Sequence, residues 1–222
     1  MTPDPAAPPA ATVAPIRYGV LPNAADYAPM ERLQSRRVQV SVLTGLNDPA
    51  DYDVQVGFGN IAGWEAVPME LAPVSLVLDV TRPPFDDPAL VQVVRQAVAA
   101  EAIVAEAEII GMQALAGGGA ADVRGALAKA GYPDGFSIYG RIDRLPGAAA
   151  VVAQLAEANI TVTPTQAENA HLRLARLADS ERGAAEQAVI DLYTLPMSYT
   201  VRDGLLVTFT DDGWVVAARE DE

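Results

Sequence analysis

The sequence predicts an α/β fold with two small lobes, each with a mostly parallel sheet, and a β-hairpin region near the C-terminal end. Apolar residues alternate in runs that recur between helical segments, as in βαβ units. Half of the 222 residues are hydrophobic, which is enough for cores of ordinary size. Near the end, β-rich runs are separated by the hairpin signals Asp203-Gly204 and Asp212-Gly213.

Residues 16–83 are expected to form the first lobe. Strands are predicted at 16–22, 38–45 and 52–59, because apolar side chains alternate there. A helix is predicted after Asn23, and further extended runs are predicted at 64–71 and 72–80.

Residues 84–222 are expected to form the second lobe. A helical region follows Asp86 or Asp87, either of which can cap it, with Pro88 in the first turn. Further helices are predicted at 122–130 and 148–158, and a strand is predicted at 160–163. The stretches 170–179 and 183–192 also look helical.

The stretch "AGYPDGFSIYG" at 130–140 predicts a sharp connection from a helix to a strand. Gly131 lies just past the helix, where a left-handed residue closes the last turn. Pro133-Asp134-Gly135 forms a turn, because proline presets φ and glycine accepts a positive φ. Phe136 and Ile138 then point to one side of the emerging strand.

Composition excludes several classes of function. There is no cysteine, so disulfides, thiolate metal sites and cysteine nucleophiles are excluded. The formal net charge of −14 repels phosphate backbones, so nucleic acid is not an expected partner. No run approaches the roughly 18–20 consecutive apolar residues of a membrane span, and no signal-peptide pattern is visible.

The first fifteen residues, "MTPDPAAPPAATVAP", include five prolines and predict a semi-extended tether. Such tethers commonly join a membrane anchor to an exported domain. We therefore expect an extracytoplasmic protein, in the periplasm or at the cell surface, with a lipid anchor as one means of attachment. The alternative is an unstructured N-terminus of a cytoplasmic protein.

Several motifs occur in the order typical of one family. They are Pro-Phe-Asp-Asp at 84–87, Arg-Gln-Ala at 95–97, Gly-Tyr-Pro-Asp-Gly-Phe at 131–136, "VVAQLAEANITVT" at 151–163 and "IDLYTLPMSYTVRDGL" at 190–205. Over roughly residues 74–205 the chain resembles extracellular solute-binding proteins of the dipeptide, oligopeptide and nickel-binding type.

That resemblance implies a periplasmic-binding-protein-like fold of type II and a small solute, peptide-like or other, held between two lobes. It also implies a membrane permease of an ABC-type importer as partner. The chain is much shorter than members of that family. Ala100-Glu101 stands where the family often has Asp-Arg, which puts a peptide site in doubt.

Six residues are candidates for contact with a ligand. Asn23 and Tyr27 lie in the loop after the first strand, although Asn23 could serve only as a helix cap. Asn60 and Trp64 belong to a glycine-rich loop, and a buried structural role is the alternative for Trp64. This loop lacks the lysine and hydroxyl of a phosphate-binding P-loop.

Arg82 precedes Pro83-Pro84 and could clamp a carboxylate, or could instead form a salt bridge with Asp86 or Asp87. Tyr139 leaves the connector on a strand and could either line the cleft or face solvent.

No set of catalytic residues can be recognised, so an enzyme is not expected, and neither is a cofactor or a metal. His171 is the single histidine and is expected to face solvent on a helix. Two alternatives to solute binding stay open. The fold could be a degenerate binding protein that serves as a non-catalytic interaction or scaffold module, or it could carry an enzyme activity.

Overall fold

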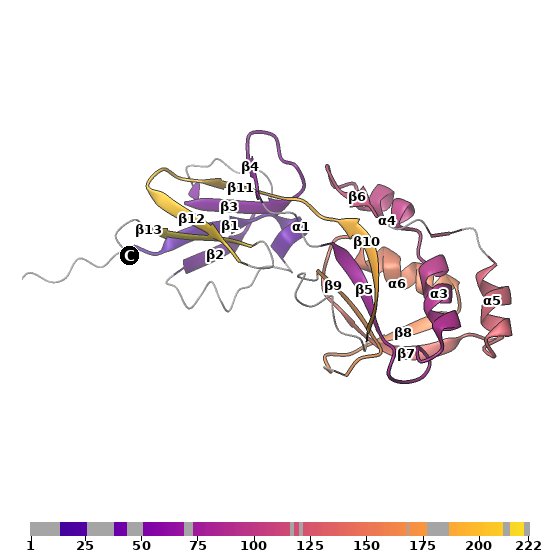
Figure 1. Ribbon diagram of the computed structural model, residues 1–222. Helices are drawn as coiled ribbons and strands as arrows, with labels where there is room; N and C mark the ends of the chain where they lie inside the picture. Colours follow the sequence, from indigo (N-terminus) through magenta and orange to yellow (C-terminus); the bar gives the residue numbers. More distant parts are fainter. Residues whose placement is uncertain are drawn as a thin grey trace, which may run out of the picture.

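The computed structural model describes residues 14–25, 38–43, 51–68, 73–115, 118–119, 122–167, 169–176, 187–210 and 214–219. These residues form two lobes, each with its own sheet (Figure 1). The predicted α/β class with two small lobes is therefore confirmed. Residues 1–13 of the predicted tether, most of the helix predicted after Asn23, and Tyr27 lie outside the described residues.

The first lobe contains a five-stranded sheet in the order β2-β1-β3-β11-β4. Its strands are β1 (Ile16–Val20), β2 (Val38–Val42), β3 (Val54–Phe58), β4 (Glu65–Ala66) and β11 (Met197–Val201). β1 pairs in parallel with β2 and β3, and β11 pairs antiparallel with β3 and β4. The short helix α1 (Pro22–Ala25) directly follows β1.

The antiparallel hairpin of β12 (Leu205–Phe209) and β13 (Val215–Arg219) packs on the first lobe. The backbone N–H of Ala217 donates to the Tyr18 hydroxyl oxygen at 2.5 Å. β12 and β13 flank Asp212-Gly213 and pair as the predicted hairpin requires, while the turn residues 211–213 lie outside the described residues. Asp203-Gly204 makes a turn, but the strands on either side of it belong to different sheets, because β11 pairs with β3 and β4.

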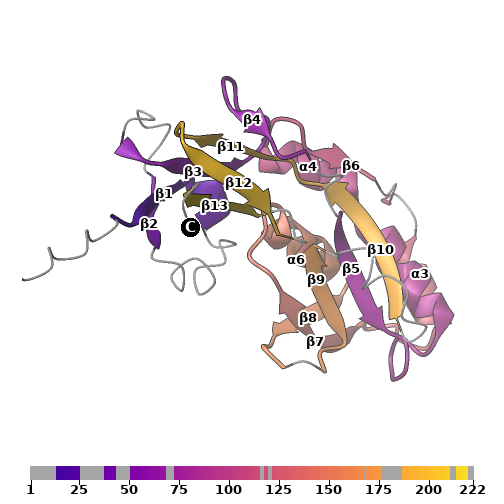
Figure 2. The ribbon, with the colours of Figure 1, turned by 60° about the vertical axis from the view of Figure 1, so that its left-hand side comes forward.

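The second lobe contains a six-stranded sheet in the order β6-β10-β5-β9-β7-β8. Its strands are β5 (Val74–Asp79), β6 (Gln113–Ala114), β7 (Phe136–Ile142), β8 (Ile160–Pro164), β9 (Leu172–Arg176) and β10 (Gln187–Thr194). The helices α3 (Pro88–Ala97), α4 (Ala100–Ala107) and α6 (Ala148–Glu157) lie on one face of this sheet (Figure 2). α5 (Val123–Lys129) packs against α3.

Residues Pro88–Ala107 are long and apolar enough to cross a membrane, judged by length and composition alone. In the structure they form the two helices α3 and α4, which break at Val98 and Ala99. Asp87 caps α3, since its carboxylate accepts from the Ala89 N–H at 2.8 Å. Gln154 of α6 accepts from the Ala99 N–H at 2.8 Å and so fills the break.

Two of the predicted helices are strands. The stretch 170–179 contains β9 and the stretch 183–192 contains the start of β10. In β9, Leu172 and Leu174 are buried, whereas Arg173 between them is partly exposed. In β10, Ile190 and Leu192 are buried, whereas Asp191 between them is partly exposed. The period of two was hidden by alanine, leucine and arginine, which favour helices when tertiary contacts do not override them.

The sheets are mixed, whereas mostly parallel sheets were expected. The parallel pairings are those of β1 with β2 and β3, and of β7 with β8 and β9. β10 runs antiparallel to β5, because β5 carries the chain away from the first lobe and β10 brings it back.

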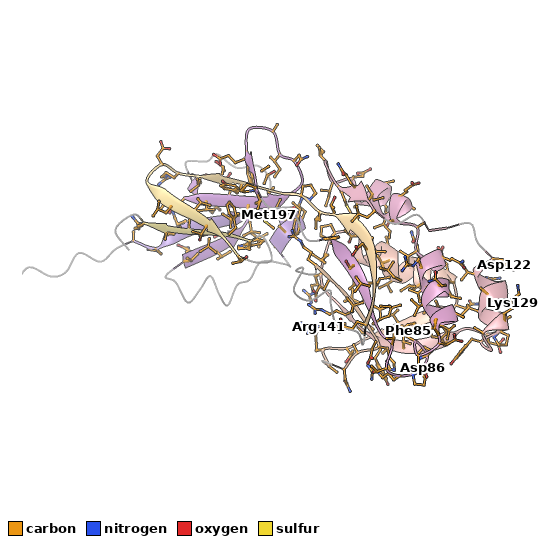
Figure 3. The ribbon with its side chains drawn as sticks, viewed as in Figure 1. Phe85, Asp86, Asp122, Lys129, Arg141 and Met197 are labelled. Atoms are coloured by element: carbon orange, nitrogen blue, oxygen red, sulfur yellow. The ribbon has the colours of Figure 1, made fainter. Side chains whose placement is uncertain are left out.

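The expected boundary at residues 83 and 84 does not coincide with a change of sheet. The chain leaves the first sheet between β4 and β5, and returns to it between β10 and β11. Only Leu195 and Pro196 separate β10 from β11. Met197 lies where the chain re-enters the first lobe, whereas Phe85 lies at the far end of the second lobe (Figure 3).

The predicted stop between helix and strand is confirmed. α5 ends at Lys129, Gly131 has φ 89° and Gly135 has φ 80°. A Cβ on Gly135 would lie 2.0 Å from the Asn159 carbonyl oxygen, so the turn needs glycine for space as well as for its φ. Ile138 is buried, and the Phe136 ring packs edge-on against Phe85.

Candidate functional site

A cavity of about 440 Å³ lies between the two lobes. The first lobe contributes Pro22 and Asn23, which follow β1. The second lobe contributes Ala107, Ile109 and the segment 144–149, which joins β7 to α6. We call this the inter-lobe cavity. The carboxyl ends of parallel strands in the two lobes thus meet at one place, where α/β folds commonly bind ligands.

Hydrogen bonds fix the first-lobe wall of the inter-lobe cavity. The Asn23 side chain donates to the Phe58 carbonyl at 2.9 Å and accepts from the Phe58 N–H at 3.2 Å. Asn23 is the second residue of α1, so it does not cap this helix. These bonds anchor α1 to the end of β3, and they leave one amide hydrogen and one lone pair for other partners.

The second-lobe wall is held by a buried tyrosine of β10. The Tyr193 hydroxyl donates to the Pro146 carbonyl at 2.5 Å, and burial raises the pKa of Tyr193 so far that the phenol stays protonated. Gly147 begins α6 with φ 83°, and a Cβ there would lie 2.6 Å from a methyl group of Ile103. The loop before α6 is therefore packed tightly against Tyr193 and Ile103 of the second lobe.

The second-lobe wall carries one basic side chain. Arg144 is exposed and is the charged side chain of the cavity lining. The N-terminus of α6 adjoins it, with no side chain capping its first N–H groups. A guanidinium beside a helix N-terminus can accommodate a carboxylate or another small anion.

One edge of the inter-lobe cavity carries a direct hydrogen bond between the lobes. The Asn60 N–H donates to the Ile110 carbonyl at 2.8 Å, and the neighbouring Ile109 lines the cavity. Gly111 has φ 88°, and a Cβ there would lie 2.2 Å from the Asn60 side-chain nitrogen. We call this contact between Asn60 and the segment 109–111 the lobe clasp.

The predicted site residues do not converge on one place. Asn23 lines the inter-lobe cavity and Asn60 forms the lobe clasp beside it. Arg82 and Tyr139 line a different cavity in the second lobe. Trp64 is half-buried and lines neither of these two cavities.

This second cavity has a volume of about 380 Å³, and we call it the Tyr139 cavity. It is lined by Arg82, Tyr139, Thr165, Ala167, Asn169, Ala170 and His171. Arg82 forms an ion pair with Asp79 at 2.7 Å. The salt bridge with Asp86 or Asp87, which the sequence left open as an alternative role for Arg82, is therefore not the pair that forms. His171 lies in the connection before β9, not on a helix.

Two parts of the inter-lobe cavity were missed in the sequence. Arg144, Pro146 and Gly147 lie between the end of a parallel strand and the start of a helix, which is the usual position of ligand-binding loops. That position could have singled them out. Ile109 could not have been found, because the lobe clasp depends on contacts between residues far apart in the chain.

No protein-family profile matches the sequence, and no curated protein matches it. Solved structures do resemble it. HbpA2 from Haemophilus parasuis has 11% identity and a TM-score of 0.48, over 89% of this chain and 56% of that protein. A dipeptide-binding protein from a Pseudoalteromonas species, in complex with Met-Leu, has 11% identity and a TM-score of 0.48, over 76% and 50% of the two chains.

A substrate-binding protein from Microbacterium hydrocarbonoxydans, complexed with 4-hydroxybenzoate hydrazide, has 12% identity and a TM-score of 0.49, over 79% and 57% of the two chains. The chain thus spans between half and three-fifths of these proteins. One of these structures is the dipeptide-binding protein, and the sequence motifs resemble binding proteins of the dipeptide, oligopeptide and nickel-binding type. At TM-scores below 0.5 the likeness assigns no function to this chain, so its function is inferred from the sequence motifs and from the geometry of the site.

Proposed function

We propose that this chain is a solute-binding protein that holds a small solute between its lobes and delivers it to an ABC-type importer. The inter-lobe cavity carries this proposal. Its volume of about 440 Å³ falls within the usual range for small-molecule sites, and both lobes contribute to its lining.

The strand connections between the lobes support a hinge. β5 and β10 are hydrogen-bonded neighbours, and each lies next to a crossing between the lobes. Closure around a ligand is commonly absorbed by a few residues at such crossings. Within the described residues, Leu195 and Pro196 occupy such a crossing.

The charge of the lining favours a solute with a carboxylate. Arg144 and the N-terminus of α6 would receive that group, and Asn23 would offer its remaining amide hydrogen from the opposite lobe. Amino acids and short peptides meet this requirement. The role implies a location outside the cytoplasm beside a membrane permease, with the proline-rich residues 1–15 as the tether.

Thermal-shift and calorimetric titrations with paired ligands test this proposal. Short peptides and single amino acids are compared with their C-terminal amides, and simple sugars and nickel complete the panel. A free carboxylate is expected to raise Tm, whereas the amide of the same peptide is not. Arg144→Gln should weaken binding of the acid about tenfold or more, because a charge-assisted pair is lost.

Arg95→Gln is the matched control, since Arg95 is exposed on α3 and does not line the inter-lobe cavity. Binding that is equally tight for acids and amides, or indifferent to Arg144→Gln, would refute the assigned solute class.

One observation favours a non-catalytic scaffold as the second candidate. The Asn23 amide is engaged by the Phe58 backbone, so the first lobe offers a ligand few free polar groups. A well-folded sample that binds nothing in the panel would support the scaffold and contradict solute transport.

A further inference from the structure

We propose that the Tyr139 cavity is a second binding site, which takes a neutral ring bearing several hydroxyl groups, such as a monosaccharide unit. This goes beyond solute binding between the lobes. All residues that line the Tyr139 cavity belong to the second lobe, and it shares none of them with the inter-lobe cavity. Its volume of about 380 Å³ accommodates one such ring.

An aromatic face forms one wall of the Tyr139 cavity. Tyr139 is 58% exposed on β7, and its ring stacks against that of His171 with centroids 6.1 Å apart and planes 23° apart. The Tyr139 N–H donates to His171 Nδ1 at 3.3 Å, which ties the two residues together. A flat apolar face held in this way can pack against the carbon–hydrogen face of a sugar ring.

The charges around this wall balance locally. Arg82 is paired with Asp79, whose carboxylate also accepts from the Thr81 hydroxyl at 2.6 Å. Burial alone would raise the pKa of Asp79, but the hydrogen bonds from Thr81 and the charge of Arg82 outweigh it and lower that pKa. Burial and the nearby Arg82 lower the pKa of His171, so the imidazole is neutral at pH 7. A neutral ligand suits such a site better than an anion.

Donors and acceptors surround the aromatic wall. Because Nδ1 of the neutral His171 accepts a hydrogen bond, its proton lies on Nε2, which can donate to a ligand. Thr165 contributes a hydroxyl, which already accepts from the Ala167 N–H at 3.1 Å. Arg82 contacts the Asn169 carbonyl, which orders the loop beside these groups. Mixed donors and acceptors around a flat face complement a ring with hydroxyl groups on its rim.

Saturation-transfer NMR with methyl glycosides of glucose, galactose and mannose tests the proposal on the full chain. Benzoate and phenyl phosphate serve as charged rings of similar size. We expect transfer to the ring protons of at least one glycoside, with a millimolar Kd, and weaker transfer to both anions. Shifts of the Tyr139 and His171 backbone amides should accompany the titration.

Tyr139→Ala should lower the affinity for that glycoside at least tenfold, while Tyr139→Phe, which keeps the ring, should retain most of it. Both variants should keep the Tm of the parent chain, because the side chain is largely exposed. Arg95→Gln is the control for altered surface charge. Failure of every glycoside to bind, preference for the anions, or binding that survives Tyr139→Ala would overturn the proposal.

The outcome is independent of solute binding between the lobes. A peptide that saturates the inter-lobe cavity should not displace the glycoside. Arg144→Gln should weaken binding of the peptide and leave binding of the glycoside unchanged. Displacement by the peptide would show one shared site and would also overturn the proposal.

Discussion

The two lobes differ in how the chain builds them. The second lobe is one continuous stretch from β5 to β10, and α3, α4 and α6 cover one face of its sheet. The first lobe is assembled from two stretches, β1 to β4 and β11 to β13, with the short α1 as its described helix. A discontinuous lobe requires two crossings of the chain between the lobes, and the proposed hinge would lie at these crossings.

The same difference appears in the cavities. The second lobe supplies most of the lining of the inter-lobe cavity and all of the lining of the Tyr139 cavity. The first lobe supplies Pro22 and Asn23. Ligand choice is therefore expected to reside in the second lobe, while the first lobe acts mainly as the opposing wall.

The largest effect is expected from a buried residue of the second lobe. Leu155 of α6 is fully buried, so Leu155→Ala should lower the free energy of unfolding by about 2–5 kcal/mol. Urea denaturation followed by circular dichroism measures it. Leu206→Ala is the control, because the Leu206 side chain on the hairpin is 52% exposed. It should lower the free energy of unfolding by less than about 1 kcal/mol. Equal losses would contradict the difference in burial between Leu155 and Leu206.

Tyr18→Phe tests how the first lobe joins its two stretches. It removes the oxygen that accepts from the Ala217 N–H and leaves a buried donor without its partner, at a cost of about 1–3 kcal/mol. Hydrogen exchange should accelerate in β13. Tyr132→Phe is the control, because the Tyr132 hydroxyl makes no hydrogen bond within the described part of the chain. Unchanged exchange in β13 would show that other contacts hold the hairpin.

Gly111→Ala probes the lobe clasp, and Gly131→Ala is its matched control. The two glycines have φ of 88° and 89°, so alanine strains both backbones alike, by about 1–2 kcal/mol. Only at Gly111 does the new Cβ meet Asn60; nothing lies within 4 Å at Gly131. We expect Gly111→Ala to cost roughly 1 kcal/mol more and to speed exchange of the Asn60 amide. Identical results for both variants would argue against the clasp.

The smallest effect concerns pH. The pKa of His171 is lowered in the folded chain, so the unfolded chain binds the proton more readily. The stability that His171 contributes is therefore complete above its ordinary pKa of 6.5 and is lost as the pH falls below it. His171 is the single histidine, so His171→Gln should reduce the loss of stability between pH 7.5 and 5.5. A loss as large in the variant as in the parent would contradict this.

Much of the fold could be predicted from local chemistry. The strands β1, β2 and β3, the Asp87 cap of α3 and the turn at 133–135 are encoded by neighbouring residues, and each element appears as expected. The alternation itself is not confirmed throughout, because every residue of β3 is buried and Val42 at the end of β2 is exposed. β9 and β10 were mistaken for helices, because only their pairing with β5 reveals which side chains point inward.

The candidate site was harder to predict than the fold. Arg82 and Tyr139 come together only because β5, β7 and β9 lie in one sheet. The inter-lobe cavity depends on how two lobes meet around Asn60 and Ile110, which no local pattern records. Tyr27 and the residues of the predicted tether up to 13 lie outside the described residues, so their roles stay predictions.

The bond between Tyr18 and Ala217 joins residues 199 positions apart. Ribosomes add roughly 5–20 residues per second, so β1 waits many seconds for the strands that complete its lobe. The stretch from β5 to β10, which forms the second sheet, is synthesised between the two parts of the first lobe. The lobe whose synthesis begins first is therefore the lobe whose synthesis is completed last.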